Sequence, residues 1–167
     1  QAPHIPSLST LKMENKRNNH MSKKVVLAFS GGLDTSFCVP YLKEKGYEVH
    51  TVMVNTGGFS AEEEKAIESR ALALGAASHK NVNAVETYYT KGIKYLIYGN
   101  ILKNATYPLS VSSERVFQAL EVLKHVKELG AGAVAHGSTG AGNDQVRFDI
   151  VFEILAPEVK IIAPVRD

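Results

Sequence analysis

A turn rich in glycine and hydroxyl groups separates an apolar run from a polar run near the start of the chain. Its sequence is VVLAFSGGLDTSF, residues 25–37. Two adjacent glycines, Gly31 and Gly32, let the backbone approach a ligand closely, and a helix starting after them presents free N–H groups at its positive dipole end. Hydroxyl donors stand nearby at three positions: Ser30, Thr35 and Ser36. These residue types predict a binding site for phosphate groups, such as a pyrophosphate.

Two common phosphate-binding patterns do not fit this turn. A Walker A loop ends in Gly-Lys-Ser/Thr because its lysine neutralises phosphate charge, but Leu33 and Asp34 occupy that region. A dinucleotide fingerprint needs three spaced glycines, and SGGLDTS has one adjacent pair. Asp34 beside a phosphate suits a cation, so we expect it to hold Mg²⁺ directly or through water. The alternative is that Asp34 or Thr35 merely caps the helix, although capping alone does not call for two glycines.

A second stretch, AHGSTGAGNDQVRFD at 135–149, is dense in glycine and hydrogen-bonding groups. Asn143 and Arg147 are four residues apart and share a face if the helix has begun, which suits a paired amide and guanidinium that bind a carboxylate. The alternative is a glycine-rich loop with a capped helix behind it. His136 could serve as a base, but we favour a structural histidine at a strand end.

Short β-branched runs alternate with longer segments of helical period from residue 24 onward. This alternation predicts an α/β fold with a doubly wound, mostly parallel five-stranded sheet and helices on both faces. The strands are expected at 25–29, 48–54, 78–82, 133–136 and 160–163. The nearly continuous apolar run at 25–29 predicts a central strand that is covered on both sides. Both polar loops follow strands, so we expect them at the same edge of the sheet.

Five helices are expected between these strands. The first follows Asp34 and ends at Gly46, and the second opens with a capping box of Ser60 and Glu63 and stops at Gly75. The remaining three are expected at 86–98, 113–129 and 144–155. Three tyrosines of the 86–98 helix are expected to pack mostly in the core: Tyr88, Tyr95 and Tyr98. Four residues of the 113–129 helix form its apolar stripe: Val116, Leu120, Leu123 and Val126.

Length and composition limit the classes of function. A chain of 167 residues with 44% hydrophobic residues can bury one core and is expected to form a single domain. The net charge of +2 and the scattered basic residues do not favour a nucleic-acid partner. No apolar run reaches the roughly 18 residues of a membrane span. The single cysteine, Cys38, gives no sign of an oxidising compartment, so we expect a cytoplasmic protein.

The two ends of the chain suggest that the sequence differs from a complete natural product. Residues 1–20 show no helical or strand period and are predicted to be a disordered leader, such as a cloning or upstream-frame remnant. Met21 is the expected natural start, and residues 21–167 the expected domain. The chain stops just after the last expected strand, which suggests a piece of a longer protein.

The two polar stretches together carry a resemblance to a known family. SGGLDTS resembles the pyrophosphate loop, SGGxDS/T, of the N-type ATP pyrophosphatases, which include tRNA-modifying and amidating enzymes. The stretch at 135–149 closely resembles the AHGxTGxGNDQVRF motif of argininosuccinate synthase, and the similarity runs from about 23 to 165. The resemblance implies the nucleotide-binding domain of an enzyme with an adenine nucleotide alpha hydrolase-like fold. Other members of the superfamily, or an ATP-binding fragment without turnover, are the alternatives.

The resemblance also implies an activity and partners. The family joins citrulline and aspartate with MgATP, through citrullyl-AMP and release of PPi. Its members continue into a second, synthetase domain and form homotetramers. One departure from relatives is Asn55, where an acid is more usual.

Site residues follow from the same resemblance. It implies nine residues around the ATP phosphates: Ala28, Phe29, Ser30, Gly31, Gly32, Leu33, Asp34, Thr35 and Ser36. Gly137 would touch the nucleotide through its backbone. The residues implied for aspartate are Thr139, Asn143 and Asp144, and those for citrulline are Tyr107, Ser112, Asn143 and Arg147. Asp144 as partner of an ammonium group and Arg147 as partner of a carboxylate are the expected catalytic residues, acting by positioning and charge stabilisation.

Overall fold

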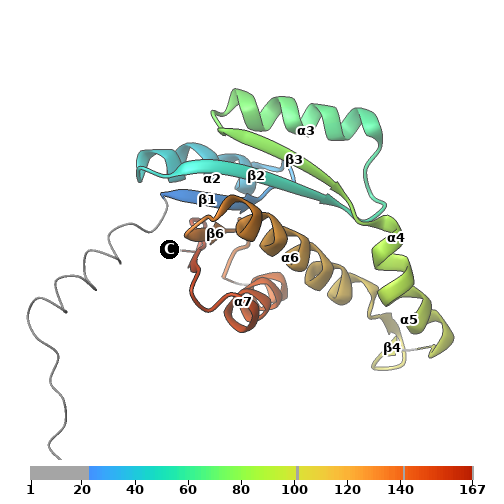
Figure 1. Ribbon diagram of the computed structural model, residues 1–167. Coiled ribbons are helices and arrows are strands. Elements are labelled where there is room, and N and C mark those ends of the chain that lie inside the picture. The colour runs from blue at the N-terminus through green and yellow to red at the C-terminus, as the bar shows by residue number, and fades with distance from the viewer. Residues whose placement is uncertain (1–22, 101, 141, 167) are drawn as a thin grey trace, which may run out of the picture.

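The chain folds around a five-stranded sheet in which every strand is parallel to its neighbours (Figure 1). The computed structural model describes residues 23–100, 102–140 and 142–166, so the predicted leader 1–20 and the expected start at Met21 lie outside it. The strand order is β3-β2-β1-β6-β7. Strand bounds are Lys24–Ala28 for β1, Glu48–Asn55 for β2, Ser78–Asn83 for β3, Ala133–Ala135 for β6 and Lys160–Ile162 for β7. All five predicted strands are confirmed.

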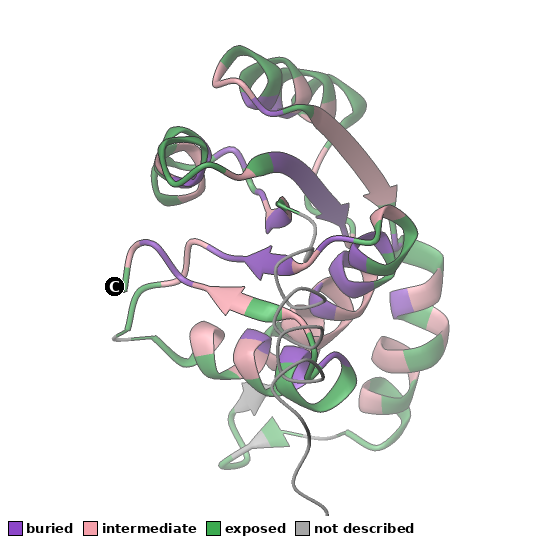
Figure 2. Ribbon diagram, turned by 60° about the vertical axis from the view of Figure 1, so that its left-hand side comes forward, coloured by how far each residue is buried: buried purple, intermediate pink, exposed green. Residues whose placement is uncertain are grey.

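Strand β1 is the middle strand of the sheet, and both of its faces are covered. Val26 packs in one core cluster with helices α6, Ser110–Leu129, and α7, Asn143–Leu155. Val25 and Leu27 pack in the other cluster with α2, Leu33–Glu44, and α3, Ala61–Ala73. All three side chains have no exposed surface. Figure 2 shows the buried residues concentrated on the inner strands β2, β1 and β6 and on the inner sides of the helices, as expected for a doubly wound fold.

Local sequence fixes where these helices begin and end. Ser60 and Glu63 form the predicted capping box at the start of α3. Helix α6 ends at Gly130, whose φ of 58° lies in the left-handed region that favours glycine. It begins three residues earlier than predicted, at Ser110, and its predicted stripe faces the sheet, with Leu123 and Val126 buried. The predicted positions of α2, α3, α6 and α7 are therefore confirmed.

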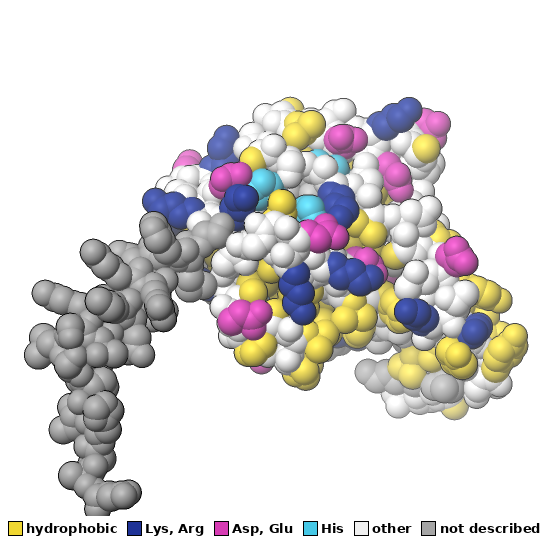
Figure 3. All heavy atoms as spheres, viewed as in Figure 1, with side chains coloured by type: hydrophobic (Ala, Val, Ile, Leu, Met, Phe, Trp, Pro, Cys, Tyr) yellow, Lys and Arg dark blue, Asp and Glu magenta, His cyan; other side chains and the backbone are white. Residues whose placement is uncertain are grey.

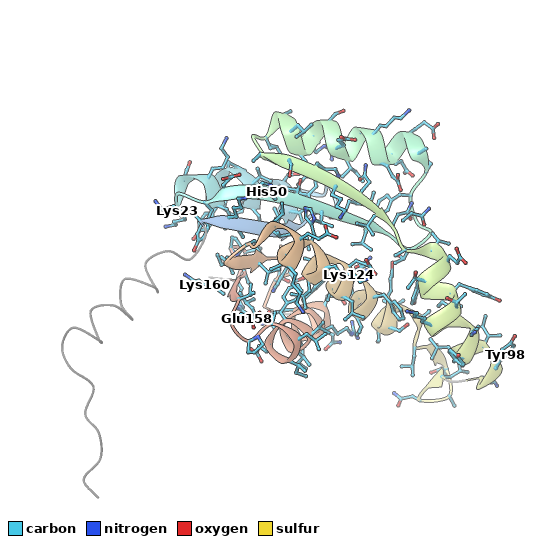
Figure 4. All side chains as sticks on the ribbon, viewed as in Figure 1. Lys23, His50, Tyr98, Lys124, Glu158 and Lys160 are labelled. Carbon is cyan, nitrogen blue, oxygen red and sulfur yellow. The ribbon has the colours of Figure 1, made fainter. Side chains whose placement is uncertain are left out.

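The segment predicted as one helix at 86–98 is broken into three pieces. A π-helical turn, η1 at Tyr89–Ile93, separates α4, Val85–Tyr88, from α5, Lys94–Tyr98. A π turn holds more residues than an α turn, so it rotates the residues that follow it to another face. Tyr88 is buried, and its hydroxyl donates a hydrogen bond of 2.6 Å to the Ser110 carbonyl. Tyr95 and Tyr98 are 58% and 81% exposed, so the prediction that they pack in the core was wrong. Figure 4 shows Tyr98 at the periphery of the molecule.

A short antiparallel hairpin follows α5 and was not predicted. It pairs β4, Leu102–Lys103, with β5, Tyr107–Pro108.

Charged side chains of both signs are interspersed over the surface shown in Figure 3, in keeping with the scattered charges of the sequence. Among the described helices, none has the length and apolar character needed to cross a lipid bilayer.

Candidate functional site

A cavity of about 890 Å³ lies at the carboxyl ends of β1, β2 and β6. The loop from β1 to α2 and the loop from β6 to α7 both line it, because β1 and β6 are hydrogen-bonded neighbours whose parallel strands end at the same edge. The N-terminal part of α6 closes a further side. The two polar stretches of the sequence, separated by about 100 residues in the chain, therefore share one cavity, in the place where open parallel sheets bind ligands.

Gly137 brings the two loops into direct contact. A Cβ atom at this position would lie 3.1 Å from the Thr35 amide nitrogen and 3.2 Å from the Asp34 carbonyl carbon. Those atoms belong to the backbone at the start of α2 and cannot turn aside as a flexible side chain does. Glycine at 137 thus permits this close approach, and any larger residue would force the β6–α7 loop and α2 apart by a few tenths of an ångström.

The first turn of α2 has the features of an anion site. Its N-cap is Gly32, and no side chain caps the helix, so the alternative that Asp34 or Thr35 is merely a cap is not supported. Gly31 has a φ of 76°, in the left-handed region. Its carbonyl accepts a hydrogen bond from Arg70 of α3. That contact turns the carbonyl toward α3, while the helix start presents N–H groups.

Most of the residues predicted around the phosphates line the cavity. They are Ala28, Phe29, Ser30, Gly32, Leu33, Asp34 and Thr35. The hydroxyl groups of Ser30 and Thr35 lie 3.3 Å apart. Gly31 and Ser36 are not in the lining, and the Ser36 hydroxyl instead donates a hydrogen bond of 3.5 Å to the Gly31 carbonyl. These two residues therefore support the conformation of the loop without lining the cavity.

The residues predicted for the amino-acid substrates form a charged cluster on the other side of the cavity. Arg147 donates to the Asp144 carboxylate at 2.6 Å and to the Ser112 hydroxyl at 2.9 Å. Arg115 donates to the second oxygen of Asp144 at 3.1 Å. One carboxylate is therefore held between two guanidinium groups. The side chains in this cluster are between 23% and 40% exposed where they pair, so they are accessible from the cavity.

The remaining predicted residues lie as follows. Thr139 and Gly137 line the cavity, and so do Asn143 and Arg147, whose spacing on α7 predicted a shared face. Tyr107 lies in β5, but its side chain falls outside the described part of the structure.

Several lining residues were missed by the sequence analysis. They are Glu114, Arg115 and Gln118 on α6, with Gly58 and Phe59 from the loop after β2. The Thr56 hydroxyl donates to Glu114, which joins that loop to α6. The i, i+4 spacing of Glu114 and Gln118 puts them on one face of a helix. That spacing was the available signal, but exposed polar pairs of this kind are common on helices.

Asn55 has a structural role in the loop after β2. Its side-chain amide donates to the Phe59 carbonyl at 2.8 Å and to Glu64 at 2.7 Å, while its oxygen accepts from the Gly57 amide at 2.8 Å. A carboxylate could accept but could not donate to the carbonyl and to Glu64. The amide at this position therefore suits the local structure, whereas an acid would not.

His136 is buried at the end of β6, with 1% of its surface exposed. Its Nε2 lies 2.9 Å from Asp149, and its Nδ1 accepts from the Ser138 amide at 3.2 Å. Both ring nitrogens are engaged within the protein, which favours the structural interpretation over the general base. Burial raises the pKa of Asp149, but hydrogen bonds from His136, Gln145 and Arg166 outweigh it and hold the pKa below its ordinary value.

Comparison with solved structures supports the fold. NMN synthetase from Francisella tularensis superposes with a TM-score of 0.56 over 81% of this chain and 56% of that protein, at 8% identity. At so low an identity the likeness concerns the fold alone.

Sequence comparison identifies the family. The model of the "Arginosuccinate synthase N-terminal HUP domain" matches residues 24–167. Argininosuccinate synthase from Xanthomonas campestris pv. campestris is 49% identical over 146 residues, and that from Hyperthermus butylicus is 47% identical over 145 residues. These alignments cover 87% and 86% of this chain but 36% of each relative, so the chain spans about a third of their length. The chain belongs to the argininosuccinate synthase family, and what it contains is the N-terminal HUP domain.

Proposed function

We propose that residues 21–167 form the ATP-binding domain of an enzyme that joins citrulline and aspartate, with release of AMP and PPi. The observation that carries the proposal is the shared cavity, in which the loop at 28–36 and the loop at 135–149 meet through Gly137. The corresponding expectations for the longer protein are a homotetramer and a cytoplasmic location.

The phosphates of ATP would lie against the loop at 28–36. The N–H groups at the start of α2 and the hydroxyl groups of Ser30 and Thr35 supply donors for the phosphate oxygens. Asp34 lies in the first turn of α2, lines the cavity and is exposed. Its carboxylate fits Mg²⁺, which binds one or two protein carboxylates and takes its other ligands from phosphates and water. When bound, the metal would neutralise charge on the departing pyrophosphate.

The charged cluster would hold the two amino acids. Arg147 would bind the carboxylate of citrulline together with Asn143 and Ser112, while Thr139 would bind aspartate. Asp144 would accept a hydrogen bond from the aspartate ammonium, and it is already held in place by Arg115 and Arg147. Citrulline and aspartate would then replace some of the contacts that Arg147 and Asp144 make with each other and with their neighbours.

The reaction would proceed in two displacements. The ureido oxygen of citrulline attacks the innermost phosphorus of ATP, the bond to pyrophosphate breaks, and citrullyl-AMP forms. The amine of aspartate, after losing a proton, attacks the activated carbon, and AMP leaves. The groups that line the cavity contribute mainly positioning and charge stabilisation.

Citrulline-dependent release of PPi from ATP tests the proposal. It should be measured on a form as long as the relatives and on this chain alone. Release by the longer form only would support an ATP-binding fragment that needs the rest of the protein for turnover. Release that depends on a different cosubstrate would overturn the assignment.

Arg147→Ala in the longer form tests the placement of citrulline. The change removes the guanidinium that faces the proposed carboxylate site, so KM for citrulline should rise by about tenfold or more, and KM for ATP much less. Lys124→Ala, at an exposed lysine of α6 outside the cavity, is the control. An equal rise in both KM values for Arg147→Ala would contradict the placement.

A further inference from the structure

The carboxylate of Asp149 collects hydrogen bonds from three elements. Its Oδ1 lies 2.9 Å from the Nε2 of His136, at the end of β6. Its Oδ2 accepts from the Gln145 amide at 3.3 Å, within α7, and from the Arg166 guanidinium at 2.8 Å, near the end of the described chain. With 17% of its side chain exposed, Asp149 is held firmly in one orientation.

The contact between His136 and Ser138 fixes which ring nitrogen carries the proton. The Ser138 amide is a donor, so the Nδ1 that faces it at 3.2 Å must present a lone pair. The proton therefore resides on Nε2 and is donated to Asp149. The ring also stacks on Phe148, with centroids 5.7 Å apart and an interplanar angle of 16°. Ring position and tautomer are thus both determined by neighbours.

We propose that Asp149 is a positioning residue that selects the Nε2–H tautomer of His136 and, through the Ser138 amide, holds the backbone of Gly137 against the start of α2. Gly137 lies in direct contact with the backbone of Asp34 and Thr35 in the first turn of α2. The part of the proposal that concerns ATP rests on the proposed function. The assignment of the Nε2–H tautomer to His136 is independent of that function, because it follows from the contacts with Asp149 and Ser138.

Asp149→Asn makes a sharp test because it changes charge and donors but hardly changes shape. Arg166 and Gln145 both donate to the Oδ2 position, so the new amide will turn its oxygen toward them and its NH₂ group toward His136. Nε2 must then accept, which moves the proton to Nδ1. Two donors, Nδ1–H and the Ser138 N–H, would face each other, and the loop would lose its anchor.

Two measurements on this chain test the proposal. In ¹⁵N NMR spectra of histidine-labelled protein, the His136 signals should report Nε2–H in the wild type and Nδ1–H in Asp149→Asn. The Kd for ATP, measured by calorimetry with Mg²⁺ present, should rise by about tenfold in the variant. An Nε2–H tautomer that persists in Asp149→Asn would overturn the proposal, even if ATP binding weakened.

Glu128→Gln is the matched control. Glu128 also pairs with a buried histidine, His125, at 3.0 Å, but neither residue lines the cavity. It is the same substitution of a carboxylate by an amide and should leave the Kd for ATP unchanged. An equal weakening in both variants would overturn the proposal. If the wild-type chain does not bind ATP, the proposed function fails, while the tautomer measurement still decides the role of Asp149.

If Asp149→Asn does not fold, substitutions of His136 test the contact between its Nδ1 and the Ser138 amide. In His136→Asn the amide oxygen can take the place of Nδ1 and accept from Ser138, whereas in His136→Gln the amide nitrogen takes the place of Nε2. The Asn variant should therefore keep slower hydrogen exchange at the Ser138 amide, and tighter ATP binding, than the Gln variant. The opposite order would overturn the proposal.

Discussion

The two ends of the central sheet carry similar polar groups but differ in what those groups face. At the carboxyl ends, Arg115, Asp144 and Arg147 pair around a cavity. Near the C-terminal end of α6, which leads into the amino end of β6, Glu128 pairs with His125 at 3.0 Å and with Lys80 of β3 at 2.6 Å, outside the residues that line the cavity. Buried or paired charges alone therefore do not mark a functional site. What distinguishes the carboxyl end is a cavity bordered by the backbone of glycine residues and the start of a helix.

Glycine residues show the same contrast. At the carboxyl end, Gly137 lies so close to α2 that a Cβ atom would meet backbone. At the opposite end of α2, Gly46 has a φ of 84°, and a Cβ atom there would meet nothing within 4 Å. The first glycine is needed for the approach of two loops, the second only for the turn of the backbone. One end of the fold thus uses glycine for the site, and the other for chain reversal.

Gly137→Ala should have the largest effect on the site. The added methyl group would lie 3.0 to 3.2 Å from Thr35 and Asp34, so the β6–α7 loop must move away from α2 by a few tenths of an ångström. Since an overpacked contact costs about 2 kcal/mol, the Kd for ATP should rise by about 30-fold. Gly46→Ala is the control, because it should lower the free energy of unfolding by about 1 kcal/mol through backbone strain and leave ATP binding intact. Calorimetric titration and thermal melting measure the two effects. Equal Kd values for the two variants would remove the distinction between the ends.

Asn55→Asp should have the next largest effect, on stability. The new carboxylate faces the Glu64 carboxylate and the Phe59 carbonyl, to which the native amide donates. Replacing a donor by an acceptor at this buried position should lower the free energy of unfolding by about 2 kcal/mol at pH 7, as measured by urea denaturation. Glu64→Gln added to Asn55→Asp should restore part of the loss, because its amide can donate to the new carboxylate. A stable Asn55→Asp variant would show that the loop after β2 adapts more readily than the loop held by Gly137.

Arg70→Met should have a smaller effect, confined to the phosphate loop. The substitution removes the hydrogen bond to the Gly31 carbonyl but keeps a long apolar side chain on α3. The carbonyl would then be free to turn toward the cavity, where it repels phosphate oxygens, so the Kd for ATP should rise by about fivefold. Lys65→Met, on an exposed position of the same helix, is the control and should change nothing. An unchanged Kd in Arg70→Met would mean that Gly31 keeps its conformation without Arg70.

Patterns that are local in the sequence predicted the sheet, four of the helices and the edge of the sheet at which the cavity lies. Apolar runs such as 25–29 and the capping box at Ser60 depend only on neighbouring residues, and both loops follow from where parallel strands end. The π turn at Tyr89–Ile93 has no comparable local pattern, so the exposure of Tyr95 and Tyr98 could not be seen in advance.

Contacts between distant segments explain the site residues that were missed. Arg115 reaches Asp144 across 29 positions, and Arg70 reaches the Gly31 carbonyl across 39. In the sequence each is an ordinary arginine in an amphipathic helix, and only the packing of α6 and α3 against the sheet gives it a partner. The same holds for Asp149, whose three donors come from different elements.

Glu128→Gln should have the smallest effect, because Glu128 lies outside the cavity and 54% of its side chain is exposed. Hydrogen bonds from His125 and Lys80 lower the pKa of Glu128 to about 2, against 4.5 ordinarily. A carboxylate whose pKa is lower in the folded than in the unfolded state stabilises the fold at pH values above its pKa in the unfolded state. That stabilisation is lost as the pH falls from 4.5 toward 2. The Tm of Glu128→Gln should therefore lie slightly below that of the wild type at pH 6, with the difference shrinking at pH 3 and in high salt. A Tm difference that is independent of pH and salt would show that packing rather than charge holds this end of the sheet together.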